Sequence, residues 1–149
     1  MTIRAAAVGL FAALTIASTS AGADERASCE VLMIHGLRDG TGTDQALSSL
    51  RQLREPPFNT YTTFRLLRRS RLQLEGTTPQ SVDLPTGRNL RLSFLGRAGR
   101  RLRFQVSINR PGRADYLPAV EYVTARGEPF FQAGQTHRGG VLILAFVCR

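Results

Sequence analysis

The chain contains no lysine and no tryptophan, and all 20 of its basic residues are arginine. Without a lysine amine the chain cannot form a Schiff base, use a serine–lysine dyad or complete a phosphate-binding P-loop. Aromatic residues make up only 7% of the sequence. They are not interleaved with the basic segments in the way that base stacking on single-stranded nucleic acid requires. The composition therefore argues against these catalytic classes and against a nucleic-acid partner.

Apolar runs of membrane length are also absent. The longest, AAAVGLFAALTIA over residues 5–17, follows Arg4 and precedes the small-residue sequence Ala21-Gly22-Ala23, a pattern typical of signal peptides. It is shorter than the roughly 20 apolar residues that cross a bilayer. We expect a signal peptide over residues 1–23, cleaved after Ala23, with an uncleaved anchor as the alternative. Residues 24–149 would then form a single exported domain, in the periplasm or outside the cell.

Cysteine occurs only twice, at Cys29 and Cys148. In an exported protein two cysteines are best interpreted as one disulfide. Cys29 begins one apolar run and Cys148 ends another, so antiparallel pairing of these two strands would bring the cysteines side by side. The C-x-x-C spacing of a redox switch is absent. A zinc site made with His35 and His137 would have a spacing that matches no known pattern. We expect a structural disulfide, with no metal and no cofactor.

One amphipathic helix is expected early in the domain. Thr43 or Asp44 can cap its start, and Pro56-Pro57 prevents its continuation beyond Leu53 or Arg54. Its apolar face is formed by Ala46, Leu47, Leu50 and Leu53, a stripe that faces a protein core in such helices.

After Phe58 the apolar residues repeat at every second position, which is the period of a β-strand. The clearest alternation covers residues 101–108. In 64–75 the phase slips around Leu67 to Ser70, which predicts a bulge or a break between two strands. In residues 140–148 both the odd-numbered and the even-numbered positions are apolar, as in a strand buried on both faces. These patterns predict an α+β fold, with one helix packed on a mainly antiparallel, meandering sheet whose first and last strands are adjacent. The alternative is a β-sandwich with the helix at one edge.

The apolar stretch that runs into His35-Gly36 resembles the oxyanion-hole segment of α/β-hydrolases. That fold also needs a G-x-S-x-G nucleophile elbow and several helices, and the sequence has no such elbow. The sequence favours a simpler interpretation, in which Gly36 lets the chain turn as the strand ends and His35 caps the rim of the sheet. The sequence therefore favours a protein that is not an enzyme, and a small secreted hydrolase using His35 or His137 is the alternative.

The arginines give the clearest functional signal. Removal of residues 1–23 leaves 19 arginines against 11 acidic residues, a side-chain charge of +8. Arg91, Arg101 and Arg103 fall on one face of a predicted hairpin, and Arg69 and Arg71 lie in an earlier basic strand. Guanidinium groups match phosphate, sulfate and carboxylate geometry.

We therefore expect a non-catalytic binding or interaction module of the cell envelope or secreted space. Its arginine-rich sheet face would bind an anionic envelope component or another envelope protein. The alternative is that this face only aids solubility. A homodimer is also expected, because a second subunit could bury one face of the strands that are apolar on both sides.

Overall fold

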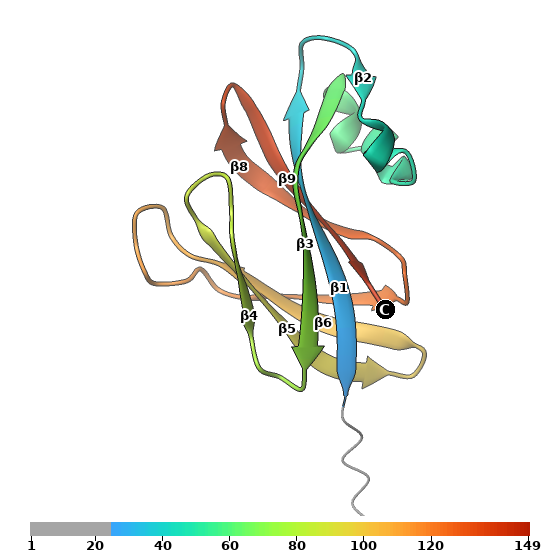
Figure 1. Ribbon diagram of the computed structural model, residues 1–149, viewed down its shortest axis with the longest axis vertical. Coiled ribbons are helices and arrows are strands. Elements are labelled where there is room, and N and C mark those ends of the chain that lie inside the picture. The colour runs from blue at the N-terminus through green and yellow to red at the C-terminus, as the bar shows by residue number, and fades with distance from the viewer. Residues whose placement is uncertain (1–24) are drawn as a thin grey trace, which may run out of the picture.

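The computed structural model describes residues 25–149, which form two packed β-sheets (Figure 1). One sheet has five strands in the order β2-β3-β1-β9-β8, and the other has four in the order β4-β5-β6-β7. The strands of the first sheet are β1 (Arg26–Leu37), β2 (Gly42–Thr43), β3 (Thr63–Glu75), β8 (Phe130–His137) and β9 (Gly140–Cys148). Those of the second are β4 (Gln80–Asp83), β5 (Asn89–Ala98), β6 (Arg101–Ile108) and β7 (Val120–Ala125). The expected signal peptide lies outside the described residues.

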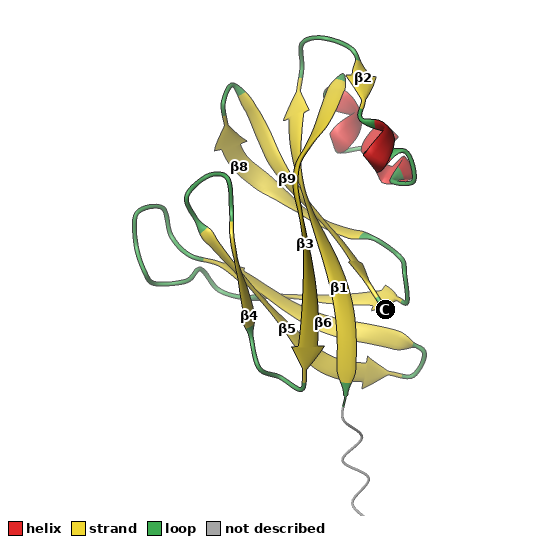
Figure 2. Ribbon diagram, in the orientation of Figure 1, coloured by secondary structure: helices red, strands yellow, loops and turns green. Residues whose placement is uncertain are grey.

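The prediction of an α+β fold is wrong, because strands dominate the chain and divide into two sheets (Figure 2). Among the described residues, helical structure is confined to three 3₁₀ turns in the segment that joins β2 to β3. These are η1 (Gln45–Leu47), η2 (Arg51–Arg54) and η3 (Phe58–Thr60). From residue 25 onward, no helix is long and apolar enough to cross a membrane.

The predicted α-helix is replaced by short 3₁₀ turns, in a segment whose leucines recur every three residues. The amide of Leu50 donates to the carbonyl of Leu47, and that of Leu53 donates to the carbonyl of Leu50. Leu50 lies between η1 and η2, and all three leucines are buried in one apolar cluster. The core-facing leucine stripe is thus present without an α-helix.

Asp44 does not cap a helix. Its carboxylate accepts hydrogen bonds from the backbone amide of Leu66 and from Nη1 of Arg65, both at 2.8 Å. The carboxylate therefore connects the start of the 3₁₀ segment to β3.

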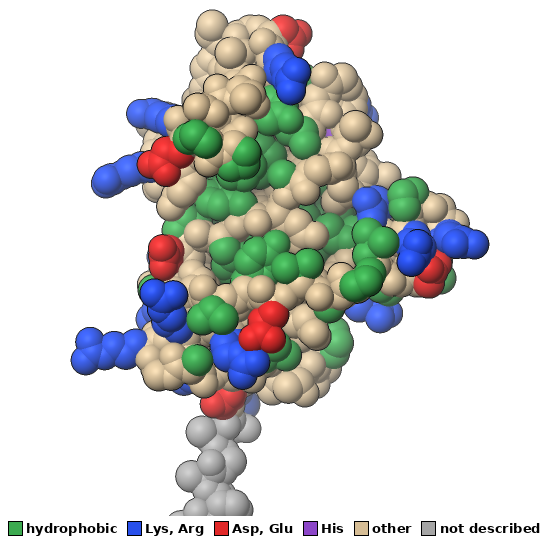
Figure 3. Space-filling view, turned by 180° about the vertical axis from the view of Figure 1, so that it is seen from behind, with side chains coloured by type: hydrophobic (Ala, Val, Ile, Leu, Met, Phe, Trp, Pro, Cys, Tyr) green, Lys and Arg blue, Asp and Glu red, His purple; other side chains and the backbone are tan. Residues whose placement is uncertain are grey.

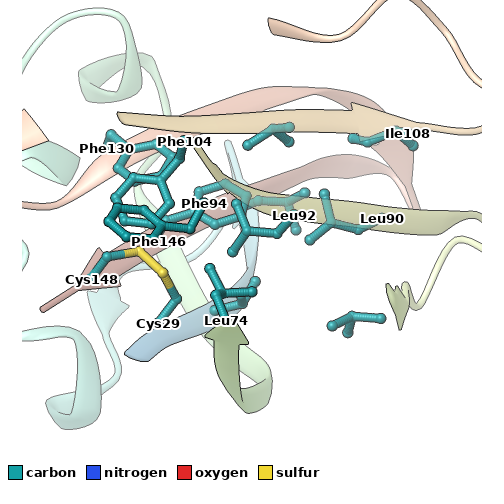
Figure 4. Close-up of a cluster of buried hydrophobic side chains, with 14 of the residues drawn as sticks. Cys29, Leu74, Leu90, Leu92, Phe94, Phe104, Ile108, Phe130, Phe146 and Cys148 are labelled. Carbon is teal, nitrogen blue, oxygen red and sulfur yellow. A yellow bond between two sulfur atoms is a disulfide. The ribbon is translucent and has the colours of Figure 1, made fainter. Parts of the chain in front are cut away.

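The first and last long strands pair in antiparallel register, with Cys29 opposite Cys148. Ser28 and Arg149 exchange backbone hydrogen bonds beside them. The cysteines therefore occupy the adjacent pair without backbone hydrogen bonds, where opposing Cα atoms are closest. Their Cα atoms are 4.1 Å apart, and the predicted disulfide is present (Figure 4). It lies against Phe146 at one end of the core between the sheets (Figure 4).

The second half of β1, from Val31, and most of β9 are buried on their two faces by parts of the same chain. Leu142 and Leu144 of β9 point into the core between the sheets. Ile143 and Ala145 point to the opposite side, where the leucines of the 3₁₀ segment cover them. The prediction that the last strand is doubly covered is confirmed. A second subunit is not needed to explain these faces, so the argument for a homodimer is removed, although the oligomeric state stays a prediction.

The phase slip predicted in β3 is a β-bulge. Met33 of β1 pairs with Arg68 and Ile34 pairs with Leu66, so Leu67 is the extra residue. A second bulge in β5 leaves Leu95 unpaired between Phe94 and Gly96. The strand continues through each bulge, and the residues beyond it exchange faces.

Candidate anion-binding surface

The five arginines predicted to form a basic face lie on two different sheets. Arg91 on β5 and Arg101 and Arg103 on β6 share the outer face of the four-stranded sheet, as the alternation predicts. Arg69 and Arg71 lie on β3, opposite Leu32 and Glu30. Leu32 packs beneath the 3₁₀ segment, which places these two arginines on the outer face of the five-stranded sheet. They therefore cannot join the other three in one patch.

Most of these arginines have partners within the molecule. The guanidinium of Arg91 stacks on the ring of Tyr116, with 3.9 Å from Cζ to the ring centroid. Arg103 forms an ion pair with Glu121 at 2.8 Å, and the hydrogen bond to Glu121 raises the pKa of Arg103. Arg69 and Arg71 lie 3.2 and 3.8 Å from the carboxylate of Glu30.

Three exposed arginines at the tip of the β5–β6 hairpin have no such partner. Arg97, Arg100 and Arg101 form no ion pair within residues 25–149, and we call them the arginine tip. Because of the β5 bulge, Arg97 pairs with Leu102 and Arg101 pairs with Ala98. These two arginines therefore project from opposite faces of the hairpin, and Arg100 lies in the turn between them. The carboxylate of Glu25 lies beside Gly96 at the base of the tip.

Only Arg101 of the arginine tip belonged to the predicted face. Arg97 and Arg100 are marked in the sequence by their position around Gly99, in the turn between two alternating strands. The sequence does not show which arginines are paired with carboxylates, because those partners come from other strands. On the side of the molecule shown in Figure 3, arginines lie mainly toward the margins and hydrophobic side chains fill much of the middle.

The two histidines lie together at the end of the five-stranded sheet that is opposite the disulfide. Nε2 of His35 is 2.8 Å from the backbone carbonyl oxygen of His137, and the ring centroids are 5.2 Å apart. Partial burial is the main cause that lowers the pKa of His137, and the charges of His35 and Arg138 lower it further. In the part of the chain that the structure covers, neither imidazole forms a hydrogen bond with a carboxylate or a hydroxyl. Both cysteines are in the disulfide, so the hydrolase alternative has no geometric support there.

Acidic, histidine and cysteine side chains do not gather into a metal site: among the described residues no group of three or more is placed to hold an ion. No family model, curated protein or solved structure matches this chain. Its function must therefore be inferred from its own residues.

Proposed function

We propose that this protein is an exported, non-catalytic binding module whose arginine tip holds an anionic component of the cell envelope. The observation that carries the proposal is that Arg97, Arg100 and Arg101 are exposed on one hairpin and have no ion pair within residues 25–149. The disulfide supports export, because disulfides persist in oxidising compartments. The leader-like pattern of residues 1–23 supports it independently.

The arginine tip is better suited to an external anion than the sheet faces are. Arg103 would have to give up its contact with Glu121, and Arg91 its contact with Tyr116, before binding elsewhere. The three arginines of the tip have no ion pair within residues 25–149 to break, so they would displace only water when they bind an anion. Guanidinium groups bind phosphate, sulfate and carboxylate oxygens through paired hydrogen bonds. Because they project from both faces and the end of the hairpin, the tip can enter a layer of anionic groups rather than lie flat on it.

Chromatography on heparin and co-sedimentation with anionic vesicles test this proposal. The variant Arg97→Ser/Arg100→Ser/Arg101→Ser removes the tip charges. The matched control, Arg51→Ser/Arg54→Ser/Arg113→Ser, removes the same charge from exposed arginines elsewhere. We expect wild type and control to be retained and to elute with salt, and the tip variant to lose most of its retention. Equal losses in the two variants would show that net charge alone is responsible, and would overturn the proposal.

A further inference from the structure

A cleft opens between the two sheets at the opposite end of β6 from the arginine tip. Its lining comes from the β4–β5 turn, the end of β6, the segment that leads into β7, and residues 132–135 of β8. The cleft has a volume of about 250 Å³. The hydroxyl of Thr86 donates to Oε1 of Gln135 at 2.8 Å, which ties the β4–β5 turn to β8 beside this cleft. The cleft therefore has walls from both sheets.

Two buried polar atoms in these walls have no hydrogen-bond partner among the described residues. One is Nη2 of Arg88, on the four-stranded sheet, and the other is Oε1 of Gln132, on the five-stranded sheet. The guanidinium of Arg88 is held in place, because its Nε donates to the carbonyl oxygen of Asn109 at 2.7 Å. Gln132 pairs with Leu144 and so points toward the space between the sheets. Buried polar groups in folded proteins are nearly always hydrogen-bonded, so a donor and an acceptor left unpaired in one cleft suggest a ligand.

We propose that this cleft binds an extended peptide segment of a partner protein. One peptide unit carries an acceptor and a donor that point in opposite directions. Once the two side chains turn toward the cleft and expose these buried atoms, the peptide carbonyl would accept from Nη2 of Arg88 and the peptide N–H would donate to Oε1 of Gln132. A carboxylate or phosphate offers acceptors alone and would face the Gln132 oxygen unfavourably.

The rest of the cleft also fits a peptide. Leu117 and Val120 are large, exposed apolar residues on one wall and can contact a peptide side chain. On the other wall, β8 is the end strand of its sheet, and no described strand pairs with its outer side. An extended chain can hydrogen-bond to such an edge. This site is separate from the arginine tip and from the anion proposed to bind there.

Selection from a library of short random peptides displayed on phage tests this inference. The selection is done at high ionic strength, because salt suppresses exposed charge contacts, including those of the arginine tip. Enriched peptides are then synthesised and titrated against the ¹⁵N-labelled protein. We expect saturable shifts of the backbone amides of residues 132–135 and of Leu117, Ala119 and Val120. The variant Gln132→Leu keeps the volume of the side chain and removes the acceptor, and we expect it to bind at least about tenfold more weakly.

Gln52→Leu is the matched control, because Oε1 of Gln52 is also buried without a hydrogen-bond partner, but on the 3₁₀ segment. It should bind the selected peptides as wild type does. Thermal unfolding of each variant shows whether it remains folded. The inference is overturned if no peptide is enriched, if Gln132→Leu binds unchanged while folded, or if the shifts map elsewhere. A negative result for peptide binding would not change the retention of the protein on heparin, so the two proposals are tested independently.

Discussion

At the scale of single residues, Phe130 joins the two sheets through stacked rings. Its ring lies parallel to that of Phe146, with centroids 4.7 Å apart, and stacks on Tyr122 of the other sheet at the same distance. Phe104 completes the group at 5.8 Å. Phe130→Ala removes the middle of this stack, and the cavity should cost about 3–5 kcal/mol of unfolding free energy. Urea denaturation measures it. A loss no larger than that of a surface substitution would contradict this account of the core.

His137 gives a prediction about pH. Its folded pKa is lowered from the ordinary value of 6.5 by burial and by the charges of His35 and Arg138. As the pH falls through 6.5, the unfolded chain gains a proton that the folded chain does not yet accept, so stability decreases until the folded pKa is reached. The variant His137→Gln should lack this component. Unfolding free energies measured across that pH range in both proteins should diverge, and parallel curves would exclude the effect.

The arginines that the sequence predicts as a basic face show what sequence can reveal at this scale. Alternation places Arg91, Arg101 and Arg103 on one face, and the structure has them there. The ion pair of Arg103 with Glu121 depends on the neighbouring strand β7, which no local pattern identifies. Availability of an arginine for an external ligand is therefore a property of the fold.

At the scale of elements, the segment between β2 and β3 depends on Asp44. Its carboxylate satisfies the amide of Leu66, and the hydrogen bond from Arg65 is the main reason for its lowered pKa. Asp44→Ala should destabilise the fold by about 1–3 kcal/mol, because the Leu66 amide loses its partner. Asp39→Ala, at an exposed position, is the control for loss of a carboxylate. Urea denaturation should give a clearly lower unfolding free energy for Asp44→Ala than for Asp39→Ala. Equal unfolding free energies would refute this role of Asp44.

The sequence predicts some elements well, for physical reasons that are local. Apolar residues at both odd and even positions indicate that β9 is covered on both faces. A slip in alternation between Leu67 and Ser70 indicates an irregularity in β3, which the structure shows to be a bulge at Leu67. The helix prediction fails because Leu47, Leu50 and Leu53 fit a three-residue repeat as well as one face of an α-helix. The division into two sheets is also not visible, since each strand has similar alternation whichever sheet it joins. Pairing between distant strands is decided by the packing of the whole core.

At the scale of the whole molecule, the disulfide links the two ends of the described chain across a separation of 119 residues. Closing so long a loop restricts the unfolded state by about 4–5 kcal/mol in the chain-entropy model. The variant Cys29→Ser/Cys148→Ser should therefore be less stable by up to that amount and still form the β1–β9 pair. Guanidinium denaturation with and without reductant tests it. A double variant as stable as the oxidised protein would contradict a structural role.

Net charge also acts over the whole molecule, and attraction of a positive protein to polyanions is general. The proposed function is narrower, because it concentrates the contact with the polyanion at the arginine tip. Binding of a polyanion releases counterions, so the slope of log affinity against log salt reports how many charges take part.

The most direct test of the central claim is this slope, measured by titration calorimetry with heparin. The account predicts a clearly shallower slope and weaker binding for Arg97→Ser/Arg100→Ser/Arg101→Ser. The control Arg51→Ser/Arg54→Ser/Arg113→Ser should keep a slope close to that of wild type. The same slope in both variants would contradict the claim that the arginine tip is the site of anion binding.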